Sequence, residues 1–190
     1  MSVSFSAAVG HQVAPGQTTV FSGKVSGSDG SGLSNARVVL QERTDAGWRP
    51  VGEATTTKDG SVTLSSQPAN RTARYRIKVD DLRSAPWRLV LKPTLNASAS
   101  TTGSVATVSV AATGGRSGSP VLLMTRQDGK QVVVTSSSLG SDGRVRFQVP
   151  APAAQTWYVV RIVATGAHAG ATTRVLVAPG VPEPTVTPSP

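Results

Sequence analysis

Residues 74–79 read RYRIKV, in which cations and apolar side chains alternate strictly. Tyr75, Ile77 and Val79 occupy one set of positions, and Arg74, Arg76 and Lys78 occupy the other. A period of two residues indicates a β-strand with one face in a core and the other in solvent. The segment therefore predicts a sheet with an apolar inner face and a row of cations on its outer face.

Comparable segments recur along the whole chain. We expect strands near 18–25, 36–42, 48–54, 62–64, 75–79 and 87–91, and again near 105–110, 121–125, 131–135, 145–149, 158–162 and 173–177. Asp-Gly turn pairs separate several of them, as at Asp59-Gly60 and Asp142-Gly143. About seven short strands in about 85–90 residues is the size of an immunoglobulin-like β-sandwich. The predicted fold class is all-β, with two such sandwiches in tandem.

An internal repeat supports the tandem arrangement. Shifting the sequence by 83 residues aligns Val38–Val79 with Val121–Ile162 without a gap, and nine of the 42 positions are identical. Turn residues align with turn residues and apolar positions with apolar ones. We therefore expect one domain at 3–92, a second at 95–178, and a Pro/Thr-rich linker or tail at 179–190.

The composition excludes several classes of site. The 190 residues include no cysteine, which rules out disulfides and a thiol nucleophile. The net charge is +9, although only 15% of the residues are charged. No stretch approaches the roughly 20 apolar residues of a membrane span, and the first ten residues lack the pattern of a signal peptide.

The sequence predicts no catalytic residues, no cofactor and no metal site. His11 and His168 lie near no G-x-S-x-G motif, and we expect both on the surface. Four of the ten acids, Asp29, Asp59, Asp128 and Asp142, directly precede glycine, a pair typical of turns. A calcium site at Asp80-Asp81 and a Lys–Asn isopeptide bond stay open as alternatives.

The cations are the most suggestive functional feature. We expect a polyanion-binding site formed by Arg71, Arg74, Arg76, Lys78 and Arg88, with a sparser version at Arg144, Arg146 and Arg161. Such a row suits an anionic cell-surface polymer or polysaccharide. Nucleic acid is not expected, because few aromatic residues lie among the cations. Outward arginines that only keep the sheet soluble and block edge pairing are the alternative.

Several runs of the first domain resemble one repeat type. They are residues 22–25 (SGKV), 36–43 (ARVVLQER), 47–51 (GWRPV), 57–60 (TKDG) and 75–77 (YRI). The pattern is similar to bacterial Ig-like modules in secreted and cell-wall proteins of high-GC Gram-positive bacteria, and also to transthyretin-like sandwiches. The second domain departs from it, since Gln131 stands where the first domain has Trp48.

That resemblance implies a module without an active site, located outside the cell or in the cell wall. It implies a structural, spacer or adhesion role that presents neighbouring domains at a bacterial surface. Binding of an anionic cell-wall polymer through the cations, and service as accessory domains of a secreted hydrolase, are the alternatives. We expect a monomer whose partner is such a polymer or another protein.

Overall fold

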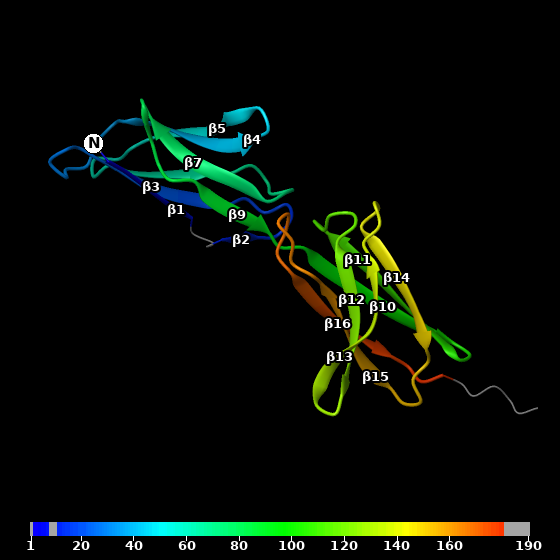
Figure 1. Cartoon of the computed structure of the whole chain (residues 1–190). Coiled ribbons are helices and arrows are strands. Elements are labelled where there is room, and N and C mark those ends of the chain that lie inside the picture. The colour runs from blue at the N-terminus through cyan, green and yellow to red at the C-terminus, as the bar shows by residue number, and fades with distance from the viewer. Residues whose placement is uncertain (1, 8–10, 181–190) are drawn as a thin grey trace, which may run out of the picture. The chain divides into compact units, whose positions relative to one another are not determined.

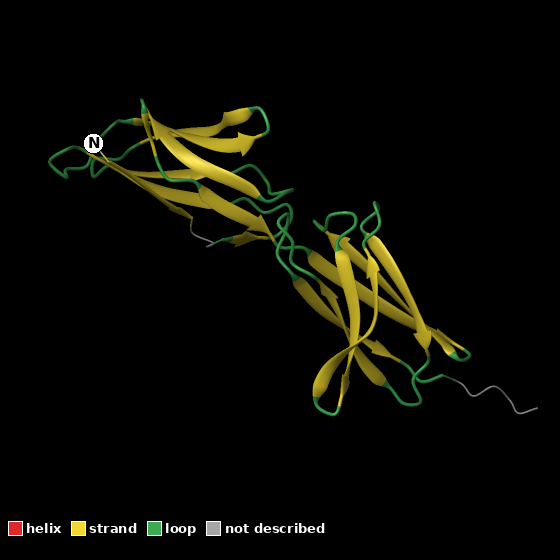
Figure 2. Ribbon diagram, in the orientation of Figure 1, coloured by secondary structure: helices red, strands yellow, loops and turns green. Residues whose placement is uncertain are grey.

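The computed structural model describes residues 2–7 and 11–180, and these residues form strands and loops without any helix (Figure 2). The chain divides into two compact units, Met1–Lys92 and Pro93–Pro190. Most of the predicted tail, residues 181–190, lies outside the described residues. Within the described ranges, no helix has the length and apolarity needed to cross a membrane.

Unit 1 contains two sheets (Figure 1). One has the order β1-β3-β6, with β1 at Ser2–Ala7, β3 at Val20–Ser26 and β6 at Ser61–Ser65. The other has the order β2-β9-β7-β4-β5, with β2 at Gln12–Val13, β9 at Trp87–Leu91, β7 at Ala73–Val79, β4 at Arg37–Thr44 and β5 at Gly47–Thr55. A short strand, β8 at Leu82–Arg83, pairs with β7.

The alternating pattern of the sequence builds the core of unit 1. Tyr75, Ile77 and Val79 are buried as predicted, and they belong to one cluster with Phe21 and Leu40. The rings of Phe21 and Tyr75 pack at 5.0 Å between centroids. Because the cluster takes residues from both sheets, the inward side chains hold the sandwich together.

Unit 2 repeats this plan. Its three-stranded sheet is β10-β11-β14, with β10 at Thr94–Thr102, β11 at Val105–Thr113 and β14 at Arg144–Pro150. Its four-stranded sheet is β13-β12-β15-β16, with β13 at Lys130–Ser138, β12 at Pro120–Gln127, β15 at Thr156–Ile162 and β16 at Ala171–Val177. Its core cluster is separate and contains Leu123, Phe147, Tyr158 and Ile162.

The order of strands in the two sheets of each unit is that of a β-sandwich. In each unit the chain crosses between two sheets of three and at least four strands, as in an immunoglobulin-like sandwich. The all-β prediction is confirmed, but the sequence did not predict β1, β10 and the two-residue strands β2 and β8. β10 is rich in Ser, Thr and Ala, and its inward positions Leu95, Ala97 and Ala99 are only partly buried against the core. Small side chains make the period of two hard to see.

Candidate functional site

The strand β7 carries three cations outward. Arg74 is exposed and Arg76 and Lys78 are half-buried, whereas the residues between them are buried in the core. The outward row of cations predicted from the sequence is therefore present. Successive outward side chains on a strand lie about 6–7 Å apart.

Neighbouring strands add to this row. Arg88 of β9 pairs in register with Arg74, and Arg83 of β8 pairs with Lys78. Residues directly opposite in a sheet share a face. β4 contributes the exposed Arg43 at an outward position. We call these six residues the basic face: Arg43, Arg74, Arg76, Lys78, Arg83 and Arg88.

One aromatic side chain orders the basic face. The guanidinium carbon of Arg76 lies 4.2 Å from the centre of the Trp48 ring, and that of Arg43 lies 5.8 Å from it. Arg76 also donates from Nε to Oε1 of Gln41 at 2.9 Å. The ring and the amide hold Arg76 in one place, which the sequence did not indicate because Trp48 comes from β5.

The electrostatics of the face are those of crowded cations. Partial desolvation, followed by the positive charges of Arg83 and Arg43, lowers the pKa of Arg76 from its usual value. An arginine remains charged at neutral pH even so. The face therefore offers a concentrated positive potential to an anion.

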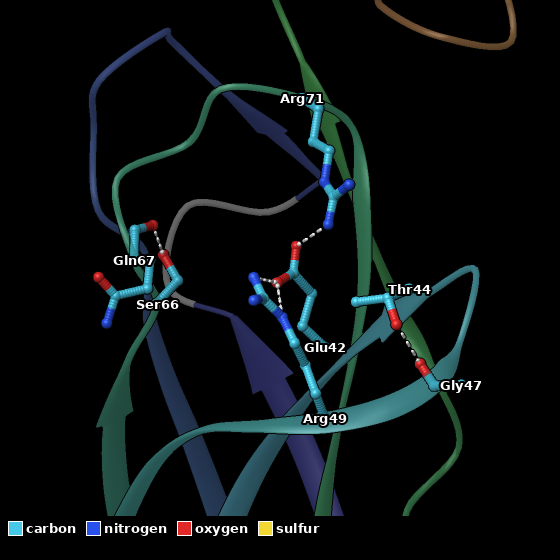
Figure 3. Close-up of polar contacts among 7 residues, drawn as sticks. All are labelled: Glu42, Thr44, Gly47, Arg49, Ser66, Gln67 and Arg71. Carbon is cyan, nitrogen blue, oxygen red and sulfur yellow. Dashed lines mark hydrogen bonds and ion pairs between the residues drawn. The ribbon is translucent and has the colours of Figure 1, made fainter.

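Arg71 does not join the basic face. Its Nη2 donates to Oε1 of Glu42 at 3.1 Å, while Arg49 donates to Oε2 of Glu42 at 2.8 Å (Figure 3). Glu42 is 6% exposed and stands opposite the buried Tyr75, so this cluster faces inward. The sequence places Arg71 near the row, but its position in a loop before β7 turns it to the other side.

The charge of Glu42 is kept by its two partners. Burial acts to raise the pKa of this carboxyl, but the hydrogen bonds and charges of Arg49 and Arg71 outweigh it. The pKa of Glu42 is therefore lowered, and the cluster carries two positive charges and one negative charge at neutral pH.

Unit 2 does not repeat the basic face. At an offset of 83, Arg74, Arg76 and Lys78 correspond to Trp157, Val159 and Arg161. Trp157 is 58% exposed and Val159 is uncharged, so Arg161 alone keeps a charge at these three positions. Arg174 of β16 lies opposite Val159 on the same face. Arg144 and Arg146 project from β14 in the other sheet, and so they form no single face with Arg161 of β15.

The two histidines differ from each other. His11 is exposed as predicted and stacks on Trp87 at 4.3 Å between ring centres. The prediction for His168 is wrong, because this side chain is 1% exposed.

The buried His168 links two loops of unit 2. Its Nε2 lies 2.6 Å from Oγ of Ser119, and its Nδ1 lies 2.9 Å from the carbonyl oxygen of Ala169. A carbonyl can only accept, so Nδ1 donates to it, and in the neutral ring Ser119 donates to Nε2. With both side chains buried, the pair ties its loops together rather than offering a nucleophile.

The aspartates that precede glycine lie in turns, as the sequence predicts, whereas Glu42 and Glu53 lie in β4 and β5. Hydrogen bonds from the side chains of Thr57 and Ser61, and from the Ser61 backbone, lower the pKa of Asp59 to about 2. Ser31 lowers the pKa of Asp29 in the same way. In the part of the chain that the structure describes, no three His, Cys, Asp or Glu side chains come close enough to hold a metal ion.

Comparison with known proteins yields no family model and no curated protein that match the chain. Solved structures do match at low similarity. The adhesin InvE of Yersinia pseudotuberculosis is 13% identical with a TM-score of 0.41, over 92% of this chain and 58% of the adhesin. A marsupial T cell receptor is 10% identical with a TM-score of 0.41, over 99% of this chain and 74% of the receptor. The human OSCAR ligand-binding domain is 12% identical with a TM-score of 0.35, over 92% of this chain and 96% of that domain.

Proposed function

We propose that this chain is a non-enzymatic, extracellular adhesion module that binds an anionic cell-surface polymer through the basic face of unit 1. The observation that carries the proposal is Arg76, held between Trp48 and Gln41 in the middle of a row of outward cations. Arginines that only keep a surface soluble need no such fixed position. A fixed guanidinium loses less conformational entropy when an anion binds it.

The spacing of the cations favours an extended polyanion. Arg74, Arg76 and Lys78 present charges about 6–7 Å apart along one strand, and Arg83 and Arg88 widen the row. A polymer with regularly spaced phosphate or carboxylate groups can contact several of them at once. Each exposed contact is weak, so affinity comes from their number and falls as salt screens them.

Binding to soluble polyglycerol phosphate tests the proposal. We expect the full chain to bind it at low salt, and Arg74→Ser/Arg76→Ser/Lys78→Ser to weaken binding by about tenfold or more. Binding should also weaken steeply between about 20 and 300 mM salt, because these contacts are exposed. Isothermal titration calorimetry gives the affinities, with neutral dextran as the uncharged polymer.

A matched control separates a site from net charge. Arg144→Ser/Arg146→Ser/Arg161→Ser also removes three positive charges, but from unit 2. We expect it to change affinity by about threefold or less, because these residues lie on two different sheets. Equal losses in the two triple variants would show that only the overall charge of the chain matters, and the basic face would then be no site.

A second candidate is a spacer that presents neighbouring domains at a bacterial surface without binding a polymer. The separate core clusters of the two units favour it, since each unit holds its own shape. Undetectable binding of the unaltered chain to polyglycerol phosphate at low salt would favour this candidate over the first.

A further inference from the structure

A polar hollow of about 410 Å³ lies in unit 1. It adjoins the Glu42 cluster, which consists of Glu42, Arg49 and Arg71 and whose contacts are drawn in Figure 3. Its lining is Glu42, Thr44, Arg49, residues 67–71 and Tyr75. These residues come from β4, β5, the loop before β7 and β7 itself. The hollow is distinct from the basic face, because Glu42 lies on the core-facing side of the sheet, opposite Tyr75, and the cations of the basic face lie on the outer side.

Glu42 binds two guanidinium groups at the edge of this hollow, one at each carboxylate oxygen. Arg49 donates from Nε and Nη2 to Oε2 of Glu42 at 3.2 and 2.8 Å, and Arg71 donates from Nη2 to Oε1 at 3.1 Å. The two arginine side chains are 58% and 53% exposed, whereas that of Glu42 is 8% exposed. The carboxylate thus fixes both cations from below while their outer sides remain open.

The cluster has donors left over. A guanidinium has five N–H groups; Arg49 uses two of them on Glu42, and Arg71 uses one. The side-chain amides of Gln67 and Asn70 are exposed, and among the described residues neither makes a hydrogen bond. The hollow therefore combines unused guanidinium donors with amides that can both donate and accept.

Unit 2 shows that the fold does not need this cluster. The cross-strand pair Glu42–Arg49 corresponds to Thr125–Val132, which occupies the same register between its two strands. Arg71 corresponds to Ala154 at the offset of 83. Tyr158 stands opposite Thr125 as Tyr75 stands opposite Glu42, so the scaffold is the same and only the charges are missing.

Burying a carboxylate between two arginines at the end of a sandwich has a desolvation penalty. Removing charges from water has a penalty that apolar residues avoid, and unit 2 uses a threonine, a valine and an alanine at these places. The fold therefore does not require the extra charges of unit 1, and their outer sides are available to bind a ligand.

We propose that the hollow between Arg49 and Arg71 binds the carboxylate of an acidic sugar. The cluster has a net charge of +1, which a single carboxylate neutralises, while a phosphate monoester with two charges would overcompensate it. The carboxylate accepts hydrogen bonds from the unused guanidinium donors. Gln67 and Asn70 stand where they can bond the hydroxyl groups of the sugar ring.

Titration with galacturonate tests this site directly. We expect saturable shifts of the Arg49 and Arg71 side-chain signals in ¹H–¹⁵N spectra of the full chain, and no such shifts with galactose. Titration to about 50 mM largely fills even a site with a Kd of about 10 mM. Absence of saturation over that range, or equal shifts with galactose, would overturn the proposal.

Two variants distinguish a site from general attraction. Arg71→Ala should weaken binding of galacturonate by at least about tenfold. Arg37→Ala removes an arginine from another ion pair with a glutamate, the exposed Arg37–Glu53 pair, and should leave the affinity unchanged. Equal weakening by the two variants would refute a specific site.

This inference is independent of the basic face. Arg74→Ser/Arg76→Ser/Lys78→Ser should keep galacturonate binding, because none of these residues lines the hollow. Loss of polymer binding in that variant, with sugar binding retained, would establish two separate sites. Loss of galacturonate binding in it would place the ligand on the basic face instead and refute the hollow.

Discussion

Replacing Gly60 by alanine should lower the free energy of unfolding of unit 1 far more than the replacement of a turn glycine usually does. Gly60 has a φ of +81°, a conformation that alanine adopts only with strain. A Cβ atom there would clash with the carbonyl oxygen of Val25, and it would lie 2.9 Å from Cα of Gly32 and 3.0 Å from the amide nitrogen of Leu33. All three are backbone atoms, so no side chain can rotate away to make room.

The magnitude follows from what the backbone must give up. The strain of alanine at positive φ costs about 1 kcal/mol. The displaced backbone also carries the hydrogen bonds from Val25 N to Gly60 O at 2.9 Å and from Leu33 N to Val25 O at 3.0 Å. Losing these at about 1 kcal/mol each or more brings the expected loss in free energy of unfolding to about 3–5 kcal/mol.

Gly129 provides the matched control. Its φ is +79°, nearly that of Gly60, but a Cβ there would meet no atom within 4 Å. Gly129→Ala should therefore cost unit 2 only the strain, about 1 kcal/mol. Urea unfolding of the full chain, followed through NMR signals assigned to each unit, measures both values. Equal costs for the two variants would show that the close approach of Val25 to Gly60 contributes nothing.

Two other predictions concern charge and buried hydrogen bonds. The pKa values of Glu42 and Asp59 are lowered in the folded unit, the latter to about 2, so their stabilisation is present above the usual carboxyl pKa and is lost as pH falls. The melting temperature of unit 1 should thus drop between about pH 5 and pH 2. Glu42→Gln should make this dependence of melting temperature on pH less steep in circular dichroism melts. An unchanged dependence would show that ionised Glu42 does not stabilise the unit. Ser119→Ala leaves Nε2 of His168 without its partner and should destabilise unit 2 by about 1–3 kcal/mol, with faster hydrogen exchange in residues 163–170. Unchanged stability and exchange would mean that the pair does not tie the loops.

The fold was largely readable from local pattern. The alternation at residues 74–79 predicted which side chains face the core, and burial confirms it for Tyr75, Ile77 and Val79. The outward course of Arg74, Arg76 and Lys78 followed from the same alternation. Strands of small residues such as β10 were missed, because serine, threonine and alanine differ too little in hydropathy to show a period of two.

The identity of each polar contact depended on long-range register. Arg71 meets Glu42 across 29 residues, and Ser119 meets His168 across 49. Alternation is a property of an extended chain and needs only neighbouring residues. Which cation meets which acid, ring or hydroxyl depends on how distant strands pair and where their loops lie, and only the tertiary structure decides that.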